Sequence, residues 1–409
     1  MSNSEANLYK GEGSKPEPVP GEQRAETHGT SRVLDLDAAR AFAALAVLLG
    51  HLRNLFLVDF GMARSKGPIV QVVYLLSGFG HFAVVIFFVL SGYLITGSIV
   101  KQHEKGNWSW GSYALNRLVR LYVVLVPALL LGALIDQIGF HAFGNRGPYA
   151  GQDYAHMFVQ PLAETSGFGV GLGNALFLQG IACPTFGTNG PLWSLSYEFW
   201  YYALFPLIFV ALRPGKAWGA RAGCLLLVAG ISLMTGPAIL ASFPIWLLGS
   251  CLVAMESLVR RRSILMSGAG LALLFFTLLF VRTHPAISPI VSDYLVGFVF
   301  ALCLLTAMPF RQREATTRVA KSISLVAEMS YSLYLVHVPL LTVLSLAILG
   351  SGGRWQPDAG HLATTALVGV GALGYAYVVY FLTESRTGWV RSKLKSGIAR
   401  LQGRVRYLP

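Results

Sequence analysis

Charged side chains are scarce in this chain of 409 residues: they make up 12% of it, against 54% hydrophobic residues. A soluble domain carries about a quarter charged residues, so the composition excludes an ordinary water-soluble fold. Strands of alternating polarity, the pattern of a membrane β-barrel, are absent as well. What remains is a series of apolar runs of about 20 residues each. These runs predict an all-α polytopic membrane protein, a bundle of about ten transmembrane helices.

Cysteine is rare too, with four residues in the whole chain. Cys224, Cys251 and Cys303 lie in apolar runs and Cys183 lies in a polar loop, and no two have the spacing of a metal site or a redox motif. We therefore expect packing roles for them and no metal. A clear internal repeat is also missing, which counts against transporter folds built from duplicated halves.

The net charge of +13 does not indicate nucleic acid, because the cations of a membrane protein collect on its cytoplasmic loops. With a cytoplasmic N-terminus, most Lys and Arg residues fall on alternate loops and on the last tail, so both termini are predicted to be cytoplasmic. The expected spans are 36–58, 78–100, 118–138, 193–212, 221–240, 242–259, 264–282, 290–309, 323–349 and 362–384.

Three regions follow from these spans. Residues 1–34 are polar and proline-containing, and we expect a disordered cytoplasmic tail there. Residues 35–385 form the transmembrane domain, and 386–409 form a basic cytoplasmic tail. The longest internal loop, 139–190, is predicted on the outer, non-cytoplasmic side of the membrane. It could cover an acceptor site or merely connect two spans.

Ionisable residues recur inside the spans. Arg40 and His51 are eleven residues apart, so they share nearly one helical face, about 16 Å apart along the axis. A deep ionisable group is costly and usually faces the protein interior or a watery cavity. A packed histidine is the alternative for His51. For Arg40, an ion pair with Asp37 at the membrane surface competes with a functional role.

Two further motifs carry polar groups. Arg117 and Arg120 lie on one face at the cytoplasmic entrance of a span, where they either anchor the helix or offer two guanidinium forks to phosphates. Glu198 lies in an apolar run beside aromatic residues, and it needs a cationic or hydrogen-bonding partner. Candidate substrate-binding residues are Ser91, Trp193, Ser194, Ser196, Tyr331 and His337.

Taken together, these motifs resemble the membrane-bound acyltransferase-3 family. The resemblance rests on "LDAARAFAALAVLLGH", "GHFAVVIFFVLSGYLI", "NRLVRLY", "PLWSLSYEFWYY" and "SYSLYLVHVPLL", in this order, from about residue 36 to 340. Members are bacterial enzymes that move acyl groups from acyl-CoA to sugars and related acceptors. The closing motif departs from the family at Glu384-Ser385-Arg386, which leaves any role of Glu384 open.

The resemblance implies His51 as the catalytic histidine. Glu198 falls on the family's WSLSxE carboxylate and is predicted as a second catalytic residue, which would orient either a histidine or the acceptor. Arg40, Arg117 and Arg120 would engage acyl-CoA, the donor substrate, while no cofactor is bound permanently. We expect transfer of an acyl group, by family frequency acetyl, to a surface glycan or related saccharide. The chain would sit in the bacterial inner membrane.

Two alternatives stay open on the sequence alone. Buried His, Arg and Glu residues suit a secondary transporter or an exporter of a lipid-linked glycan equally well. A catalytically silent scaffold is the other. The sequence does not predict which saccharide is the acceptor, which of its hydroxyls is acylated, or the oligomeric state.

Overall fold

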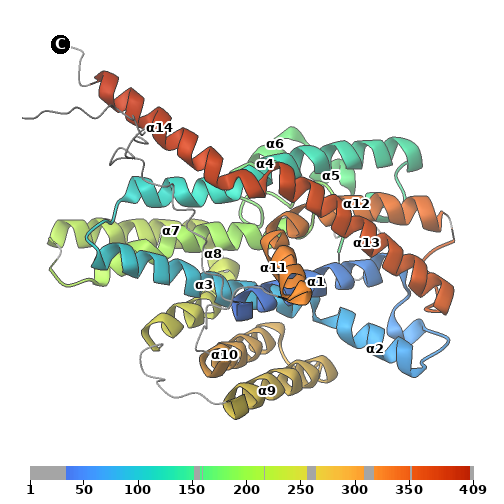
Figure 1. Ribbon diagram of the computed structural model, residues 1–409. Coiled ribbons are helices and arrows are strands. Elements are labelled where there is room, and N and C mark those ends of the chain that lie inside the picture. Colours follow the sequence, from blue (N-terminus) through green and yellow to red (C-terminus); the bar gives the residue numbers. More distant parts are fainter. Residues whose placement is uncertain are drawn as a thin grey trace, which may run out of the picture.

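The computed structural model describes residues 34–151, 157–158, 160–215, 217–255, 264–307, 317–350 and 352–405. Across these residues the chain is helical and carries no strand beyond two isolated bridges. The long helices are α1 (Leu34–Phe56), α3 (Gly80–Glu104), α4 (Trp110–Phe143), α7 (Leu192–Leu212), α8 (Trp218–Met255), α9 (Ile264–Thr283), α10 (Pro289–Ala307), α12 (Ser330–Leu349) and α13 (Ala359–Leu382). The shorter ones are α2 (Pro68–Leu76), α5 (Leu162–Thr165), α6 (Phe168–Ala175), α11 (Arg318–Glu328) and α14 (Thr387–Val405) (Figure 1).

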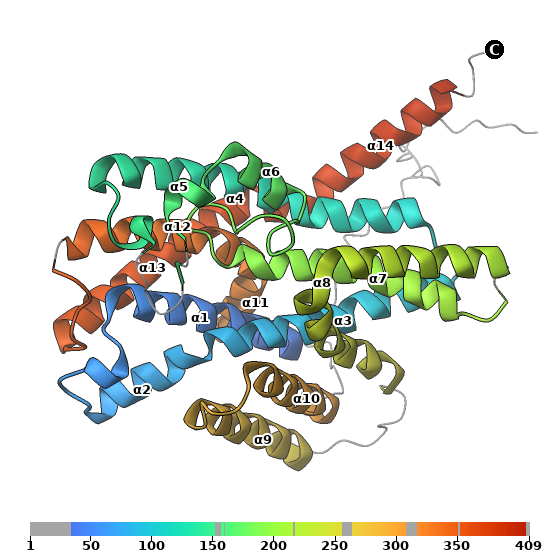
Figure 2. The same ribbon diagram turned by 180° about the vertical axis from the view of Figure 1, so that it is seen from behind.

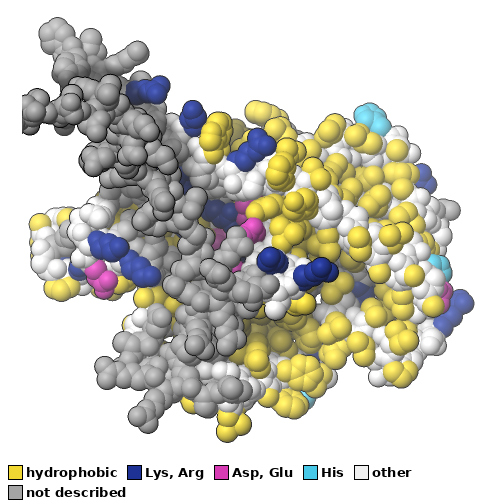
Figure 3. All heavy atoms as spheres, viewed as in Figure 1, with side chains coloured by type: hydrophobic (Ala, Val, Ile, Leu, Met, Phe, Trp, Pro, Cys, Tyr) yellow, Lys and Arg dark blue, Asp and Glu magenta, His cyan; other side chains and the backbone are white. Residues whose placement is uncertain are grey.

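The described part of the chain holds nine helical segments long and apolar enough to cross a membrane. Hydrophobic side chains cover much of the face that the long helices present (Figure 3). A helix in lipid satisfies its own backbone hydrogen bonds and exposes apolar side chains, as these helices do. The protein is therefore an all-α polytopic membrane protein, as the composition predicts.

The helix α8 stands where two spans are predicted, at 221–240 and 242–259. Its 38 residues would extend about 57 Å, nearly twice the hydrocarbon thickness of a bilayer. Gly236, with φ 75° and ψ 178°, breaks the helix, and Pro237 follows it. The two halves fold back at this break, so that both ends of α8 lie at the same end of the bundle (Figures 1 and 2). With α8 counted as two crossings, the described helices agree with the predicted number.

Other boundaries differ from the predicted ones. The predicted span 323–349 is divided at Met329 into α11 and α12. The basic segment after residue 386, predicted as a tail, forms α14 as far as Val405. Residues 1–33 of the predicted N-terminal tail lie outside the described residues.

Two glycines let α3 and α8 pack with their backbones in contact. A Cβ atom at Gly92 would lie 2.0 Å from the carbonyl oxygen of Trp246, and one at Gly249 would lie 1.9 Å from that of Val89. Close approach through small residues is a common mode of helix packing in membranes. Here it brings Trp246 of α8 against Ser91 of α3.

The predicted outer loop 139–190 folds back onto the bundle. Asp136, buried in α4, accepts hydrogen bonds from the backbone nitrogen of Thr188 (2.9 Å) and from its Oγ1 (2.8 Å). Asn189 donates to the carbonyl of Leu335 at 2.7 Å. These bonds hold the end of the loop against α4 and α12. Thr185 and Gly190 of this loop line the second of the two cavities described below.

Candidate functional site

Two cavities of similar size lie within the bundle. The first, about 480 Å³, is called the arginine chamber, and the second, about 450 Å³, the histidine chamber. The arginine chamber is lined by Arg40, Ser91, Arg117, Arg120, Ser194, Glu198, Tyr202, Glu328, Ser330, Tyr331 and Glu384, among others. The histidine chamber is lined by His51, Arg53, Asn54, Ser77, Gly78, His81, Thr185 and Trp193, among others. Val84 and Tyr334 line both, so they form the wall between the chambers.

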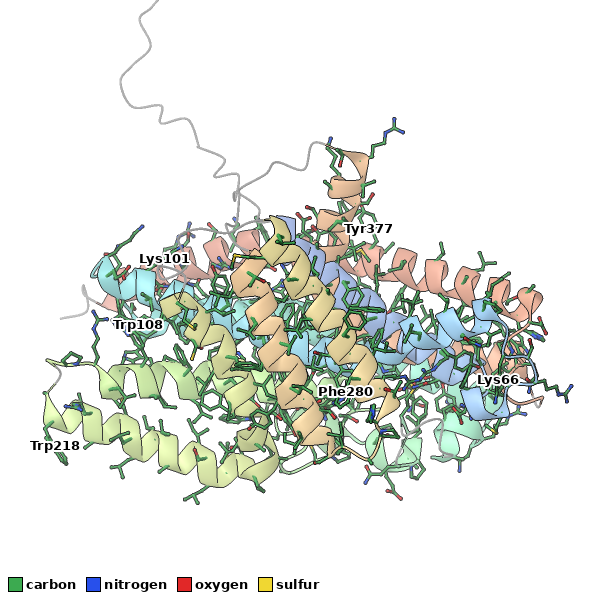
Figure 4. The ribbon with its side chains drawn as sticks, turned by 90° about the horizontal axis from the view of Figure 1, so that it is seen from below. Lys66, Lys101, Trp108, Trp218, Phe280 and Tyr377 are labelled. Carbon is green, nitrogen blue, oxygen red and sulfur yellow. The ribbon has the colours of Figure 1, made fainter. Side chains whose placement is uncertain are left out.

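The chambers lie towards opposite ends of the bundle. Figure 4 places Lys101, Trp108 and Trp218 at one end and Lys66 at the other. Ring contacts connect Trp108 through Tyr113 to Arg117 of the arginine chamber. At the other end, contacts run from Lys66 through Phe60 and Tyr74 to Arg53 of the histidine chamber.

His51 lies in a hydrogen-bonded pair with His337. Nδ1 of His51 is 2.7 Å from Nε2 of His337, and Nδ1 of His337 is 2.7 Å from the carbonyl oxygen of Leu333. A carbonyl can only accept, so Nδ1 of neutral His337 carries the hydrogen and its Nε2 is an acceptor. His51 must then donate from Nδ1, which leaves the lone pair of its Nε2 available. This tautomer is the one that a general base needs.

Glu198 belongs to a hydrogen-bonded series in the arginine chamber. Trp246 Nε1 donates to Ser91 Oγ at 3.1 Å, and Ser91 donates to Glu198 Oε1 at 3.0 Å. The hydroxyl of Tyr202 donates to the same carboxylate oxygen. Glu198 and Ser91 thus lie together, in the chamber that His51 does not line.

Arg120 is paired with Glu384. Its Nη1 lies 2.6 Å from Glu384 Oε1, while Glu384 Oε2 accepts from the backbone nitrogen of Ser332 (3.0 Å) and from its Oγ (2.7 Å). Glu384 is buried, so the Arg120 charge neutralises a carboxylate that would otherwise be costly. Glu384, whose role the altered closing motif leaves open, joins the end of α13 to α4 and α12.

Arg117 and Arg40 are less fully engaged. The Arg117 guanidinium lies 6.0 Å from the ring centroid of Tyr113 and 5.9 Å from that of Tyr202, and its buried Nε has no hydrogen-bond partner among the described residues. Arg40 approaches Ser330 Oγ at 3.5 Å and Asp37 at 4.0 Å. Both arginines can therefore bind a ligand without losing a strong ion pair.

Tyrosine residues complete the arginine chamber. Ser194 donates to the carbonyl of Pro191 at 3.2 Å, so Tyr334, at 2.7 Å, is the donor to Ser194. Tyr331 donates to the carbonyl of Leu121 at 3.2 Å, and its ring centroid lies 5.1 Å from the Arg120 guanidinium. These bonds fix the aromatic walls.

The structure distributes the predicted site residues unequally. The arginine chamber gathers Arg40, Ser91, Arg117, Arg120, Ser194, Glu198 and Tyr331, and the histidine chamber gathers His51 and Trp193. His337 and Ser196 are fully buried and line neither chamber. Direct contact of these two side chains with substrate remains a prediction. His337 lies behind His51, and Ser196 Oγ has no partner in the described part of the chain.

Several residues of the site were not predicted, above all Tyr202, Trp246 and Arg53. Tyr202 lies one helical turn after Glu198, a spacing that could have indicated the bond between them. Arg53 follows His51 by two residues, but the sequence gives no sign of which way it points. Across the described residues, no group of His, Cys, Asp and Glu is arranged to hold a metal ion.

Comparisons with known proteins identify the family of this chain. The family model described as "Acyltransferase domain", Acyl_transf_3, matches residues 33–383. A protein named O-acetyl transferase, from Shigella phage Sf6, is 26% identical over 218 residues, which cover 52% of this chain and 56% of that protein. An uncharacterized protein of Haemophilus influenzae is 29% identical over 127 residues, 31% of this chain and 47% of that protein. The chain thus spans about half the length of these relatives. No solved structure matches.

Proposed function

The chain belongs to the acyltransferase-3 family, and from this premise we propose that it is an integral-membrane O-acyltransferase. In the bacterial inner membrane it would move an acyl group, which we propose to be acetyl, from acyl-CoA to a hydroxyl of a surface glycan or related saccharide. The name of the phage relative, O-acetyl transferase, supports the choice of acetyl. The observation that carries the proposal is the His51–His337 pair, with His51 lining the histidine chamber.

The donor would occupy the arginine chamber from the cytoplasmic end. Three arginines and three glutamates line this chamber, so its formal charges balance. A balanced interior suits the uncharged acyl-pantetheine arm better than a polyphosphate. The phosphates would therefore stay at the entrance, on Arg117 with Arg40, while Arg120 remains paired with Glu384.

Glu198 would act through position rather than as a proton carrier for His51. Its hydrogen bonds within the described residues run to Ser91 and Tyr202. In this role Glu198, Ser91 and Tyr202 would shape the passage along which the thioester reaches the wall of Val84 and Tyr334. The thioester carbon would meet the acceptor oxygen where the two chambers adjoin, at these two side chains.

The chemical step follows from the histidine tautomer. Nε2 of His51 removes the proton of the acceptor hydroxyl, and the oxygen attacks the thioester carbonyl. The carbon–sulfur bond breaks as the ester forms, and the thiolate leaves with the proton from His51 or from water. An ordinary thiol pKa is about 8.5, so departure needs no strong acid. His337 would hold His51 in the reactive orientation, because its Nε2 would accept the hydrogen bond from His51 Nδ1–H throughout the reaction.

The acceptor would enter the histidine chamber from the opposite end. Acyl groups would then cross the membrane core while CoA stays on the cytoplasmic side. The position of the two chambers towards opposite ends of the bundle supports this arrangement.

The test is acyl transfer by the purified protein. With labelled acetyl-CoA and extracted surface glycan as acceptor, the wild type should produce acylated glycan and His51→Ala should not. A protein that moves a glycan across proteoliposome membranes, with no acyl transfer, would instead be the exporter that the sequence alone allows.

A further inference from the structure

We propose that the histidine chamber binds an anionic group, a carboxylate or a phosphate, that the acceptor carries near the hydroxyl to be acylated, and that Arg53 is its partner. This inference rests on the proposed function, because it names the chemical class of the acceptor at the same site. It concerns residues that the motifs of the sequence do not single out.

Arg53 is held in place within the chamber. It lies two residues after His51 on α1, and both side chains line the cavity. Its Nε and Nη2 donate to Asn54 Oδ1 at 3.1 and 2.5 Å, and its guanidinium lies 5.9 Å from the ring centroid of Tyr74. Within the described residues its Nη1 makes no hydrogen bond. Arg53 is therefore oriented by neutral groups and keeps donors for a ligand.

No described carboxylate forms an ion pair with Arg53. Asp59 is near enough for its charge to act on Arg53, but its two oxygens pair with Arg354 through bonds of 3.1 Å, and Asp293 pairs with His81 at 2.7 Å. No Asp or Glu is among the described residues that line the chamber. A largely buried cation of this kind is costly unless something neutralises it, and an anionic ligand would do so.

A second guanidinium lies behind the chamber wall. A Cβ atom at Gly78 would lie 2.6 Å from Arg282 Nε, so the Arg282 side chain packs directly on this glycine. Gly78 lines the chamber, and Arg282 is near enough to Arg53 for the two charges to act on each other. Arg282 forms no ion pair within the described residues. Two like charges at one wall give a positive field that attracts anions.

The rest of the lining suits a saccharide that carries this anion. Trp193 offers an apolar ring surface, and Thr185, Asn54 and Ser77 offer polar side chains. A few placed polar groups on a partly apolar wall are typical of small-molecule sites. The anion on Arg53 would fix the sugar, and His51 on the same helix would meet its hydroxyl.

The test measures the charge preference of the chamber without needing the acceptor. In a background with the four native cysteines changed to serine, a single cysteine is placed in the chamber by Thr185→Cys or, separately, by His51→Cys. Labelling rates are measured with 2-sulfonatoethyl methanethiosulfonate, an anion, and with its trimethylammonium counterpart, a cation. Each rate is divided by the rate of the same reagent with a free thiol in solution.

The anionic reagent should react about fivefold faster than the cationic one, because steering by a local positive field enhances encounter rates by about tenfold or more. Arg53→Gln should abolish most of this preference at both cysteines. Arg64→Gln is the matched control: Arg64 is exposed on the neighbouring loop and does not line the chamber, so its loss should leave the preference unchanged.

The proposal is overturned by no labelling of either cysteine, by an equal or reversed preference, or by a preference that survives Arg53→Gln. Asp153 lies outside the described residues, so Asp153→Asn is measured in parallel. If that change raises the preference severalfold, the cation already has a carboxylate partner, and the proposal is wrong. Labelling needs no acyl transfer, so this outcome is independent of whether the proposed reaction occurs.

Discussion

The two chambers have nearly equal volumes, about 480 and 450 Å³, but the charges of the residues that line them are balanced in one and unbalanced in the other. The arginine chamber sets three arginines against three glutamates, and its strongest ion pair, between Arg120 and Glu384, is 2.6 Å long. The histidine chamber has Arg53 with no described carboxylate in its lining. Volume therefore does not distinguish the two chambers, whereas charge compensation and the position of the histidine do.

The largest effect should come from the residue that defines the histidine chamber. His51→Ala should lower kcat for acyl transfer by about 10³-fold, within the range of general base catalysis. The affinity for acetyl-CoA should stay within about twofold, because the donor would bind in the other chamber. Isothermal titration with acetyl-CoA and an acyl transfer assay check the two halves. A parallel loss of donor binding would mean that the chambers are not separate sites.

His337 should matter through His51. His337→Leu removes the acceptor for His51 Nδ1–H and should lower kcat by about 10²-fold with little change in the acceptor KM. His337→Gln keeps a carbonyl that can accept from His51, so it should retain at least about tenfold more activity than His337→Leu. Equal activities of the two variants, measured by steady-state kinetics, would contradict a positioning role.

Arg120 should affect stability more than chemistry. Arg120→Gln leaves the buried Glu384 without its cation and should cost about 2 kcal/mol; this is below the ~3–5 kcal/mol of a fully buried pair because Arg120 is partly exposed. The double variant Arg120→Gln/Glu384→Gln should recover most of this loss. Thermal unfolding in detergent provides the measurement, and a double variant no more stable than the single one would refute the pairing.

Arg117 should affect donor binding alone. Arg117→Gln should raise the KM for acetyl-CoA by about tenfold, the value of one charge-assisted hydrogen bond, with unfolding unchanged. The rise in KM should be smaller for an acetyl-pantetheine donor, which lacks the nucleotide phosphates. An equal loss with both donors would place the phosphates elsewhere.

The smallest effect is expected at Ser196. Its hydroxyl is buried without a partner in the described residues, so Ser196→Ala removes an unsatisfied polar group. Stability should stay equal or rise by up to about 1 kcal/mol, and acyl transfer should not change. A clear loss of activity in the acyl transfer assay would support the substrate contact that the sequence predicts for Ser196.

The sequence predicts the fold well because each span carries its own signal. Apolar length and the alternation of cations locate most helices to within a few residues, and α8 could be divided more accurately from the Gly236-Pro237 pair. It also identifies four of the six charged residues that line the arginine chamber, since Arg40, Arg117, Arg120 and Glu198 are conspicuous in apolar surroundings.

What the sequence does not give is the pairing of distant residues. His51 and His337 are separated by 286 positions, and Arg120 and Glu384 by 264, so only the packing of α1 and α4 against α12 and α13 joins them. For the same reason the direction of Arg53 and the separation of the site into two chambers could not be predicted. These features depend on how far each helix is rotated about its own axis. A local sequence pattern does not fix that angle closely enough.

The central claim is that donor and acceptor occupy separate chambers that open to opposite sides of the membrane. Its most direct test uses sealed proteoliposomes and an impermeant thiol reagent on two single-cysteine variants, Ser385→Cys in the arginine chamber and Thr185→Cys in the histidine chamber. We expect the two cysteines to be labelled from opposite sides, and acetyl-CoA to protect only the one at 385. Labelling of both from one side, or protection of both by acetyl-CoA, would contradict the two-chamber account.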